Sequence, residues 1–170
     1  EVLPWIENGY LNVASPTNKS ATYTFTLGST QRFSAAIDLP NHCRTPLVSG
    51  SLLSHWLSTD PGISAKHNAT YLQATELVPT YWATSAPTAS LPSTYSPLQQ
   101  GNYPDAMGSA GYDLSIGLLP QWDVAYLTSS ATGVWAALQR NAYSAGRYGL
   151  YHRDETTFRV PRFTSYPTTV

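Results

Sequence analysis

Side chains that can move protons are concentrated near the end of the sequence. Within eight residues the chain carries Tyr148, Tyr151, His152, Arg153, Asp154 and Glu155. His and Tyr exchange protons and Arg neutralises a carboxylate, so these residue types suit proton abstraction beside an acidic group. The sequence therefore offers Tyr151, His152 and Arg153 as candidate catalytic residues.

The same residues also have a simpler explanation. Asp154 and Glu155, followed by Thr156 and Thr157, are typical of a polar turn between the strand-like runs YGLYHR and TFRVPRF. A hairpin with a charged loop needs no catalysis. His-Arg-Asp also occurs in protein kinases, but this sequence has no glycine-rich loop and no Asp-Phe-Gly, so it indicates no phosphoryl transfer.

Two short helices are predicted directly before this cluster. Pro120 is suited to open the first, over 120–128, and Ser130 can cap the second, over 131–145, which Gly146 can end. A pair of helices needs other elements to bury its outer faces. We therefore expect the C-terminal part to belong to a larger domain.

The tryptophans of these helices have two alternative roles. Spacing places Trp122 in an apolar stripe of the first helix, with Asp123 turned away from it. In the second helix the apolar residues at related spacings are Ala131, Val134, Trp135, Leu138, Ala142 and Ala145. We expect Trp135 and Leu138 to be buried. If Trp122 and Trp135 are exposed instead, they are suited to stack on sugar rings.

The N-terminal part is predicted to be β structure. Aromatic and aliphatic residues alternate with polar ones over 22–27 and 32–39, and the short turn-prone link Gly28-Ser29-Thr30 predicts an antiparallel hairpin. One face should be buried and Thr22, Thr24 and Thr26 should be more exposed. The buried face is predicted to consist of Tyr23, Phe25, Leu27, Phe33, Ala35, Ile37 and Leu39.

The rest of the chain divides by composition. The run 46–57 predicts a bent strand or a short helix from Ser51, and 75–82 predicts an edge strand interrupted by Pro79. No charged residue occurs from Leu77 to Pro104, where prolines recur. We expect an α+β chain: an antiparallel β module over 1–82, an extended Pro/Ser/Thr-rich connector over 83–108, and a helical hairpin with an irregular or β segment over 109–170. Tyr95, Leu98 and Tyr103 are suited to fix the connector to its surroundings.

Charge limits the class of partner. Charged residues make up 11% of the chain and the net charge is −1, so no basic field suits nucleic acid and we expect none as a partner. Arginines gather after Gln139, where Arg147 is a candidate contact for an acidic ligand and Asp154 for a polar one. The alternative is an ordinary solvated charged face.

Cysteine and histidine give no sign of a metal or other cofactor, and we expect none. Cys43 stands alone and is expected to be a buried, inert thiol. The four histidines are scattered without zinc-type spacing, and G-x-S-x-G is absent. No apolar run approaches a membrane span. The sequons at Asn18 and Asn68, with few lysines and many hydroxyls, favour an extracellular or cell-surface protein.

The run from Ile116 to Pro167 resembles a segment of large bacterial proteins of uncharacterised function. The shared features are a Pro-Trp helix, Asn-Ala-x-x-Ala-Gly in a second helix and a Tyr-His-Arg-Asp turn. Those proteins look similar to the helical (α/α) toroids of polysaccharide lyases and glycoside hydrolases. The resemblance implies carbohydrate chemistry and would add Asn141 to the three catalytic candidates of the turn.

Two functions remain open at this point. The first is an exported carbohydrate-related protein, as a fragment of a polysaccharide-degrading enzyme. The second is a non-enzymatic structural or adhesion module of a surface, filament or virion assembly, which self-associates or packs on a neighbouring domain. A concave polar and aromatic site favours the first, whereas a flat apolar patch favours the second.

Overall fold

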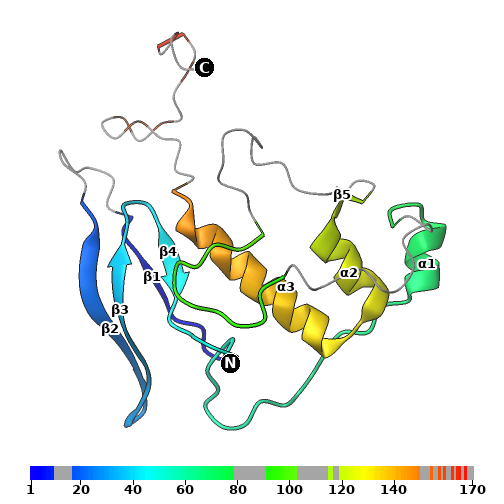
Figure 1. The fold of residues 1–170 in the computed structure, drawn as a ribbon, viewed down its shortest axis with the longest axis horizontal. Coiled ribbons are helices and arrows are strands. Elements are labelled where there is room, and N and C mark those ends of the chain that lie inside the picture. Colours follow the sequence, from blue (N-terminus) through cyan, green and yellow to red (C-terminus); the bar gives the residue numbers. More distant parts are fainter. Residues whose placement is uncertain are drawn as a thin grey trace.

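A computed structural model describes residues 1–9, 17–78, 91–102, 115–116 and 119–149, and beyond them Asp154, Thr157, Arg159, Arg162, residues 164–165 and Pro167. The chain is α+β, as predicted: antiparallel strands dominate the N-terminal part and helices the C-terminal part. In Figure 1 the β2–β3 hairpin and helix α1 lie at opposite ends of the long axis, and α3 runs between them.

The predicted hairpin is confirmed. Strand β2 (Lys19–Leu27) pairs antiparallel with β3 (Thr30–Leu39), with a shift in register after Phe25. Gly28 takes a φ of 63° in the turn, a conformation that glycine adopts without steric cost. Beside the hairpin, β1 (Trp5–Glu7) pairs antiparallel with β4 (Arg44–Pro46).

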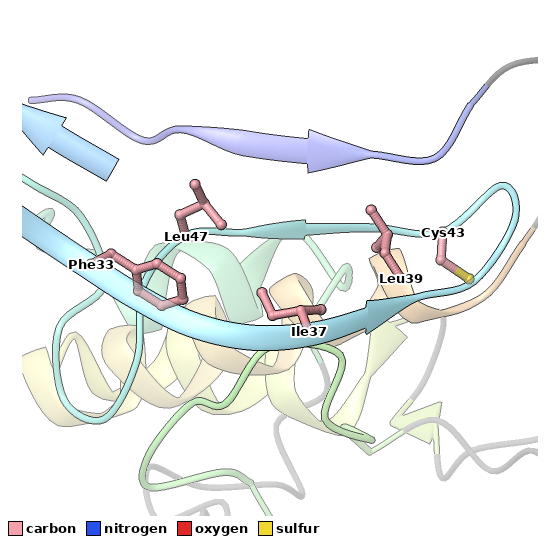
Figure 2. Packing of buried hydrophobic residues seen from close by; sticks show 5 residues of the cluster. All are labelled: Phe33, Ile37, Leu39, Cys43 and Leu47. Atoms are coloured by element: carbon pink, nitrogen blue, oxygen red, sulfur yellow. The ribbon is translucent and has the colours of Figure 1, made fainter. Parts of the chain in front are cut away.

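The predicted apolar face forms most of the first core. Figure 2 shows five buried side chains gathered between β3 and the β4 segment: Phe33, Ile37, Leu39, Cys43 and Leu47. Tyr23, Phe25 and Ala35 pack against them partly buried, and Leu27 is half-buried. The threonines of β2 on the opposite face are exposed. Period-two alternation therefore identified the correct face.

The segment after β4 is irregular. Residues 47–57 form neither a regular strand nor a helix, and they are fixed by isolated bridges of Gly50 with Tyr95 and of His55 with Val2. The imidazole of His55 is buried, and its Nε2 is hydrogen-bonded to the carbonyl of Leu47 at 2.8 Å. This histidine is structural.

Within 1–82, where an antiparallel β module was predicted, Ala69–Ala74 form helix α1, which the sequence analysis did not predict. Its N-cap is Asn68, whose Oδ1 accepts a hydrogen bond from the amide of Tyr71 at 3.0 Å. The described part of the predicted strand 75–82 is a turn after this helix, with Glu76 at a φ of 61°. Val78 is fully buried against Val124 of the next helix.

The described part of the predicted connector packs on the β module. Tyr95 is 1% exposed, and its hydroxyl is hydrogen-bonded to Thr45 Oγ1 at 2.7 Å. Leu98 packs against the first core. Both residues fix the segment as predicted, whereas Tyr103 lies outside the described residues.

The helical hairpin is also confirmed. Short strands β5 (Ser115–Ile116) and β6 (Leu119–Pro120) precede α2 (Gln121–Ser129), α3 (Thr132–Ser144) and the 3-10 turn η2 (Ala145–Arg147). Pro120 is the N-cap of α2, as the sequence suggested. Ser130 does not cap α3: it ends α2 with a φ of 51°, and its Oγ accepts a hydrogen bond from the amide of His67 at 2.7 Å.

The buried face of α3 differs from the prediction. Trp135 is 41% exposed and Leu138 is half-buried, so the expectation that both are buried is wrong. The residues that are buried instead are Ala137, Arg140, Asn141, Tyr143 and Ser144. Small and polar side chains are buried here because a backbone segment lies directly against them: a Cβ on Gly101 would stand 2.5 Å from Asn141 Oδ1.

Candidate functional site

The predicted catalytic cluster lies outside the part of the chain that the structure describes, since this part omits Tyr151, His152 and Arg153. Asp154 next to them is described. Its Oδ1 accepts a hydrogen bond from the amide of Thr157 at 2.6 Å, and its own amide donates to the carbonyl of Arg159 at 2.9 Å. Both hydrogen bonds join Asp154 to residues a few positions later in the sequence.

Arg147 is partly buried at the end of α3. Its Nη1 donates to the carbonyl of Leu98 at 3.5 Å, and its guanidinium lies 5.9 Å from the centre of the Tyr148 ring. The carbonyl of Arg147 accepts a hydrogen bond from the thiol of Cys43 at 2.7 Å. Burial raises the pKa of that thiol, which the charge of Arg147 partly offsets. Arg147 thus ties η2 to the β module, and Cys43 is buried as predicted.

Asn141 has no exposed surface. Its Oδ1 accepts a hydrogen bond from the amide of Asn102 at 2.6 Å, so this side chain connects α3 to the segment before it. Trp122 on α2 is half-buried and already has an interaction partner. Neither side chain reaches the cavity in which Trp135 lies.

Trp135 lies on the wall of a surface groove with a volume of about 560 Å³. We call it the Trp135 groove. One side is α3, the other is the loop over 53–65, and Glu1 lies at its edge. Its described lining consists of Glu1, Leu53, Ser54, Trp56, Asp60, Pro61, Gly62, Ile63, Ser64, Ala65, Tyr126, Thr132, Trp135, Ala136 and Gln139.

The ring of Trp135 contacts the ring of Tyr126, which in turn contacts the ring of His67. Its ring centre lies 5.0 Å from that of Tyr126 on α2, with 38° between the planes. Tyr126 in turn meets the ring of His67 edge to face at 4.6 Å. The tilted contact with Tyr126 packs one part of the Trp135 ring and leaves another part exposed on the groove wall.

Polar groups surround this exposed surface. Gln139 donates through Nε2 to the hydroxyl of Tyr143 at 2.6 Å, which directs its amide and leaves Oε1 as an acceptor. Asp60 Oδ1 accepts from the amide of Gly62 at 2.8 Å and shapes the facing loop. The indole N–H groups of Trp56 and Trp135 can donate. The groove thus combines apolar surface with a few fixed donors and acceptors, as ligand sites do.

In the described segments, no three His, Cys, Asp or Glu side chains gather closely enough to bind a metal ion. None of the helices found there has the length and apolar character needed to cross a membrane.

Comparison of the chain with known protein families, with curated proteins and with solved structures finds no match. The function must therefore be inferred from the geometry of the chain itself.

The sequence identified Trp135 as a candidate binding residue but did not predict the residues that surround it. Trp56 lies in an irregular stretch and Asp60 shortly after it, so no periodicity could place them, and they line the groove only because the fold brings this loop to α3. A signal did exist on α3. Thr132, Trp135 and Gln139 recur at intervals of three and four residues, which groups the tryptophan with polar residues on one face.

Proposed function

We propose that this chain binds neutral saccharides in the Trp135 groove, as part of an exported, polysaccharide-related protein. The observation that carries the proposal is Trp135, which is 41% exposed on a cavity wall, where Thr132 and Gln139 of the same helix also lie. An exposed tryptophan face presents apolar surface to the C–H face of a sugar ring.

The polar lining suits sugar hydroxyls. Each hydroxyl both donates and accepts hydrogen bonds. Gln139 Oε1 and the carboxylate of Asp60 accept, and the indole N–H groups donate, so hydroxyls at the edge of a stacked ring find partners of both kinds. A volume of about 560 Å³ lies within the range of small-molecule sites.

The charge of the groove argues against acidic sugars. Of the described residues that line it, Glu1 and Asp60 alone have charged side chains, and both are acidic. A uronate or sulfated sugar would meet like charge and no arginine or lysine. The proposal therefore concerns neutral glycans.

Degradation of polysaccharide is the second part of the proposal, and the resemblance of residues 116–167 to helical-toroid proteins supports it. The residues assigned to it are Tyr151, His152 and Arg153. Gly149 precedes these three residues in the sequence and lies beside Asn41 and His42. A Cβ added to Gly149 would stand 3.5 Å from the carbonyl oxygen of Asn41.

The test is a glycan array with the full chain, followed by calorimetric titration of the neutral glycans that bind. Trp135→Ala should weaken binding at least tenfold, because it removes the indole surface on which the sugar stacks and the apolar area that binding would bury. Trp135→Phe should retain part of the affinity. The same glycans, incubated with wild type and with His152→Ala, report release of reducing or unsaturated ends.

Tyr71→Ala is the matched control for binding. Tyr71 is an aromatic residue on α1, is 66% exposed and does not line the groove. Its removal should leave affinity unchanged. If no neutral glycan binds, or if Trp135→Ala binds as tightly as wild type, the proposal is wrong.

A specific observation favours the alternative, self-association. Leu57 and Ile63, both within the loop over 53–65, are 77% and 86% exposed. Apolar side chains so exposed suit a protein contact. Sedimentation of wild type and of the Leu57→Ser/Ile63→Ser double variant over a range of concentrations separates the functions. An assembly module forms oligomers that the double variant loses, whereas a glycan-binding monomer sediments alike in both.

A further inference from the structure

A second cleft continues the Trp135 groove along the same helix. The α3 residues of the groove are Thr132, Trp135, Ala136 and Gln139, and the second cleft is lined by Ala142 and, in η2, Gly146. These positions follow one another at helical spacing on one face. The cleft has a volume of about 590 Å³, and we call it the Trp5 cleft.

The N-terminal segment lies beside both cavities, at the edge of the Trp135 groove and in the wall of the Trp5 cleft. Glu1 lies at the Trp135 groove, and Trp5 and Glu7 line the Trp5 cleft, so residues 1–7 run beside α3 in the same direction. Tyr143 joins the two walls between the cavities: its ring meets that of Trp5 edge to face at 5.6 Å. In Figure 1 the chain passes from the N-terminus to β1 alongside α3.

The Trp5 cleft has the same kind of chemistry as the groove. Trp5 is 42% exposed, with one edge fixed by Tyr143. Glu7 and Arg44 are direct partners across the β1–β4 ladder, are exposed and line the cleft. Within the described part of the chain, no hydrogen bond or ion pair engages the side chain of either residue. A free acceptor and a free donor thus stand side by side next to an exposed indole.

This combination matches sugar hydroxyls rather than an ion. A ligand anion would bind Arg44 but meet the carboxylate of Glu7, and a ligand cation would meet the opposite conflict. Neighbouring hydroxyls of a neutral sugar donate to Glu7 and accept from Arg44 at once. Because the charges of Glu7 and Arg44 cancel, the cleft favours neither an anionic nor a cationic ligand.

The spacing of the platforms sets the size of the ligand. Trp135 in the first cavity and Gly146 in the second are about 16 Å apart along the helix axis. This distance exceeds the length of one sugar ring. We propose, on the basis of the saccharide-binding function above, that the Trp5 cleft is a second subsite and that one neutral oligosaccharide spans both cavities along α3.

The test is a length series. Cello-, xylo- and manno-oligosaccharides, from the disaccharide to the hexasaccharide, are titrated into the full chain by calorimetry. For a sugar that binds, affinity should rise with length at least tenfold, because the second subsite binds intramolecularly once the first is filled. Arg44→Ala should weaken the hexasaccharide at least threefold and leave the disaccharide unchanged.

Arg32→Ala is the matched control. Arg32 is exposed on β3, outside both cavities, and its removal changes the net charge equally. It should leave both affinities as in wild type. Trp5→Phe is a second variant, which keeps an aromatic ring against Tyr143 and should reduce only the gain with length.

The outcomes separate the two proposals. If the disaccharide binds through Trp135 but the hexasaccharide binds no more tightly, or if Arg44→Ala and Trp5→Phe leave the hexasaccharide unaffected, the second subsite is wrong and the first proposal stands. Equal losses for both lengths also contradict the spanning arrangement. If no oligosaccharide of any length binds, both proposals fail.

Discussion

Asn141 shows how a polar side chain serves as packing in this protein. It is fully buried, and its carbonyl oxygen accepts a hydrogen bond from the backbone of the segment over 91–102. The sequence suggested a catalytic part for it by resemblance. Its Oδ1 satisfies a backbone N–H that would otherwise be buried without a partner, whereas its Nδ2 is buried and has no hydrogen-bond partner among the described residues.

Gly101→Ala should destabilise the protein by about 1–3 kcal/mol, as expected for overpacking. A Cβ there would stand 2.5 Å from Asn141 Oδ1 and 2.7 Å from Ser144 Cβ, so α3 would have to move. Urea denaturation measures the loss. Gly133→Ala is the control: its Cβ would meet no atom within 4 Å, and alanine in a helix should stabilise slightly. Equal stabilities for the two variants would contradict the close approach.

Tyr95 should make stability fall at high pH. Burial raises its pKa to about 12, which the hydrogen bond with Thr45 partly offsets. Between about pH 10 and 12 the unfolded chain loses the phenolic proton and the folded chain keeps it, so unfolding becomes easier as pH rises. Denaturation at several pH values checks this. Tyr95→Phe should flatten the dependence relative to the exposed-site variant Tyr71→Phe, and an unchanged slope would disprove the assignment.

The strands and helices differ in how well the sequence predicted them. The β2–β3 hairpin was predictable, because each strand alternates cleanly and Gly28 marks the turn. The positions of α2 and α3 were predictable from Pro120 and from helical spacing. The buried face of α3 was not: it lies against a backbone segment, and small or polar residues such as Ala137 and Ser144 carry no apolar pattern.

Helix α1 was missed although the sequence carried a signal for it. Asn68 is a favourable N-cap, and alanine, leucine and glutamine follow it. The helix is only six residues long, and the β-like residues after it led to the prediction of a strand. Such a short helix is marginal alone, so its stability must come from packing on α2.

Val124→Ala tests that packing. Val124 is fully buried against Val78, with Leu72 of α1 beside it. Its truncation should cost about 2 kcal/mol through lost burial and a residual cavity. Thermal unfolding measures the change, with Leu57→Ala at an exposed site as the control. Hydrogen exchange should also show faster opening of α1, whereas an unchanged α1 would mean that the helix does not depend on α2.

Other elements of this chain pack against the helical hairpin. Tyr143 of α3 packs with Val48 and Tyr95, and Leu72 of α1 packs in the cluster of Val124 on α2. Val48, Tyr95 and Leu72, which pack against α2 and α3, are therefore distant from these helices in sequence. Neither the groove nor the cleft was predictable, because their walls come from 1–7, 53–65 and α3, which only the fold brings together.

Binding of a neutral saccharide should depend little on salt. With 11% charged residues and a net charge of −1, the molecule has no strong field, and hydrogen bonds to hydroxyls are short-range. Raising sodium chloride from low to about 1 M, where screening acts within about 3 Å, should change the Kd less than twofold. Titrations at both salt concentrations check this. A steep salt dependence would point to an ionic ligand instead.

Tyr143 packs against Trp5, Val48 and Tyr95, and this packing matters for the chain while it is being synthesised. At about 5–20 residues per second, the ribosome adds the chain from Trp5 to Tyr143 in roughly seven to thirty seconds. During that time the local β2–β3 hairpin can form, but the apolar side chains that pack against Tyr143 in the folded protein remain exposed to solvent. A nascent chain halted before α3 should therefore bind chaperones and be cut by proteases, and release of the last helix should end both.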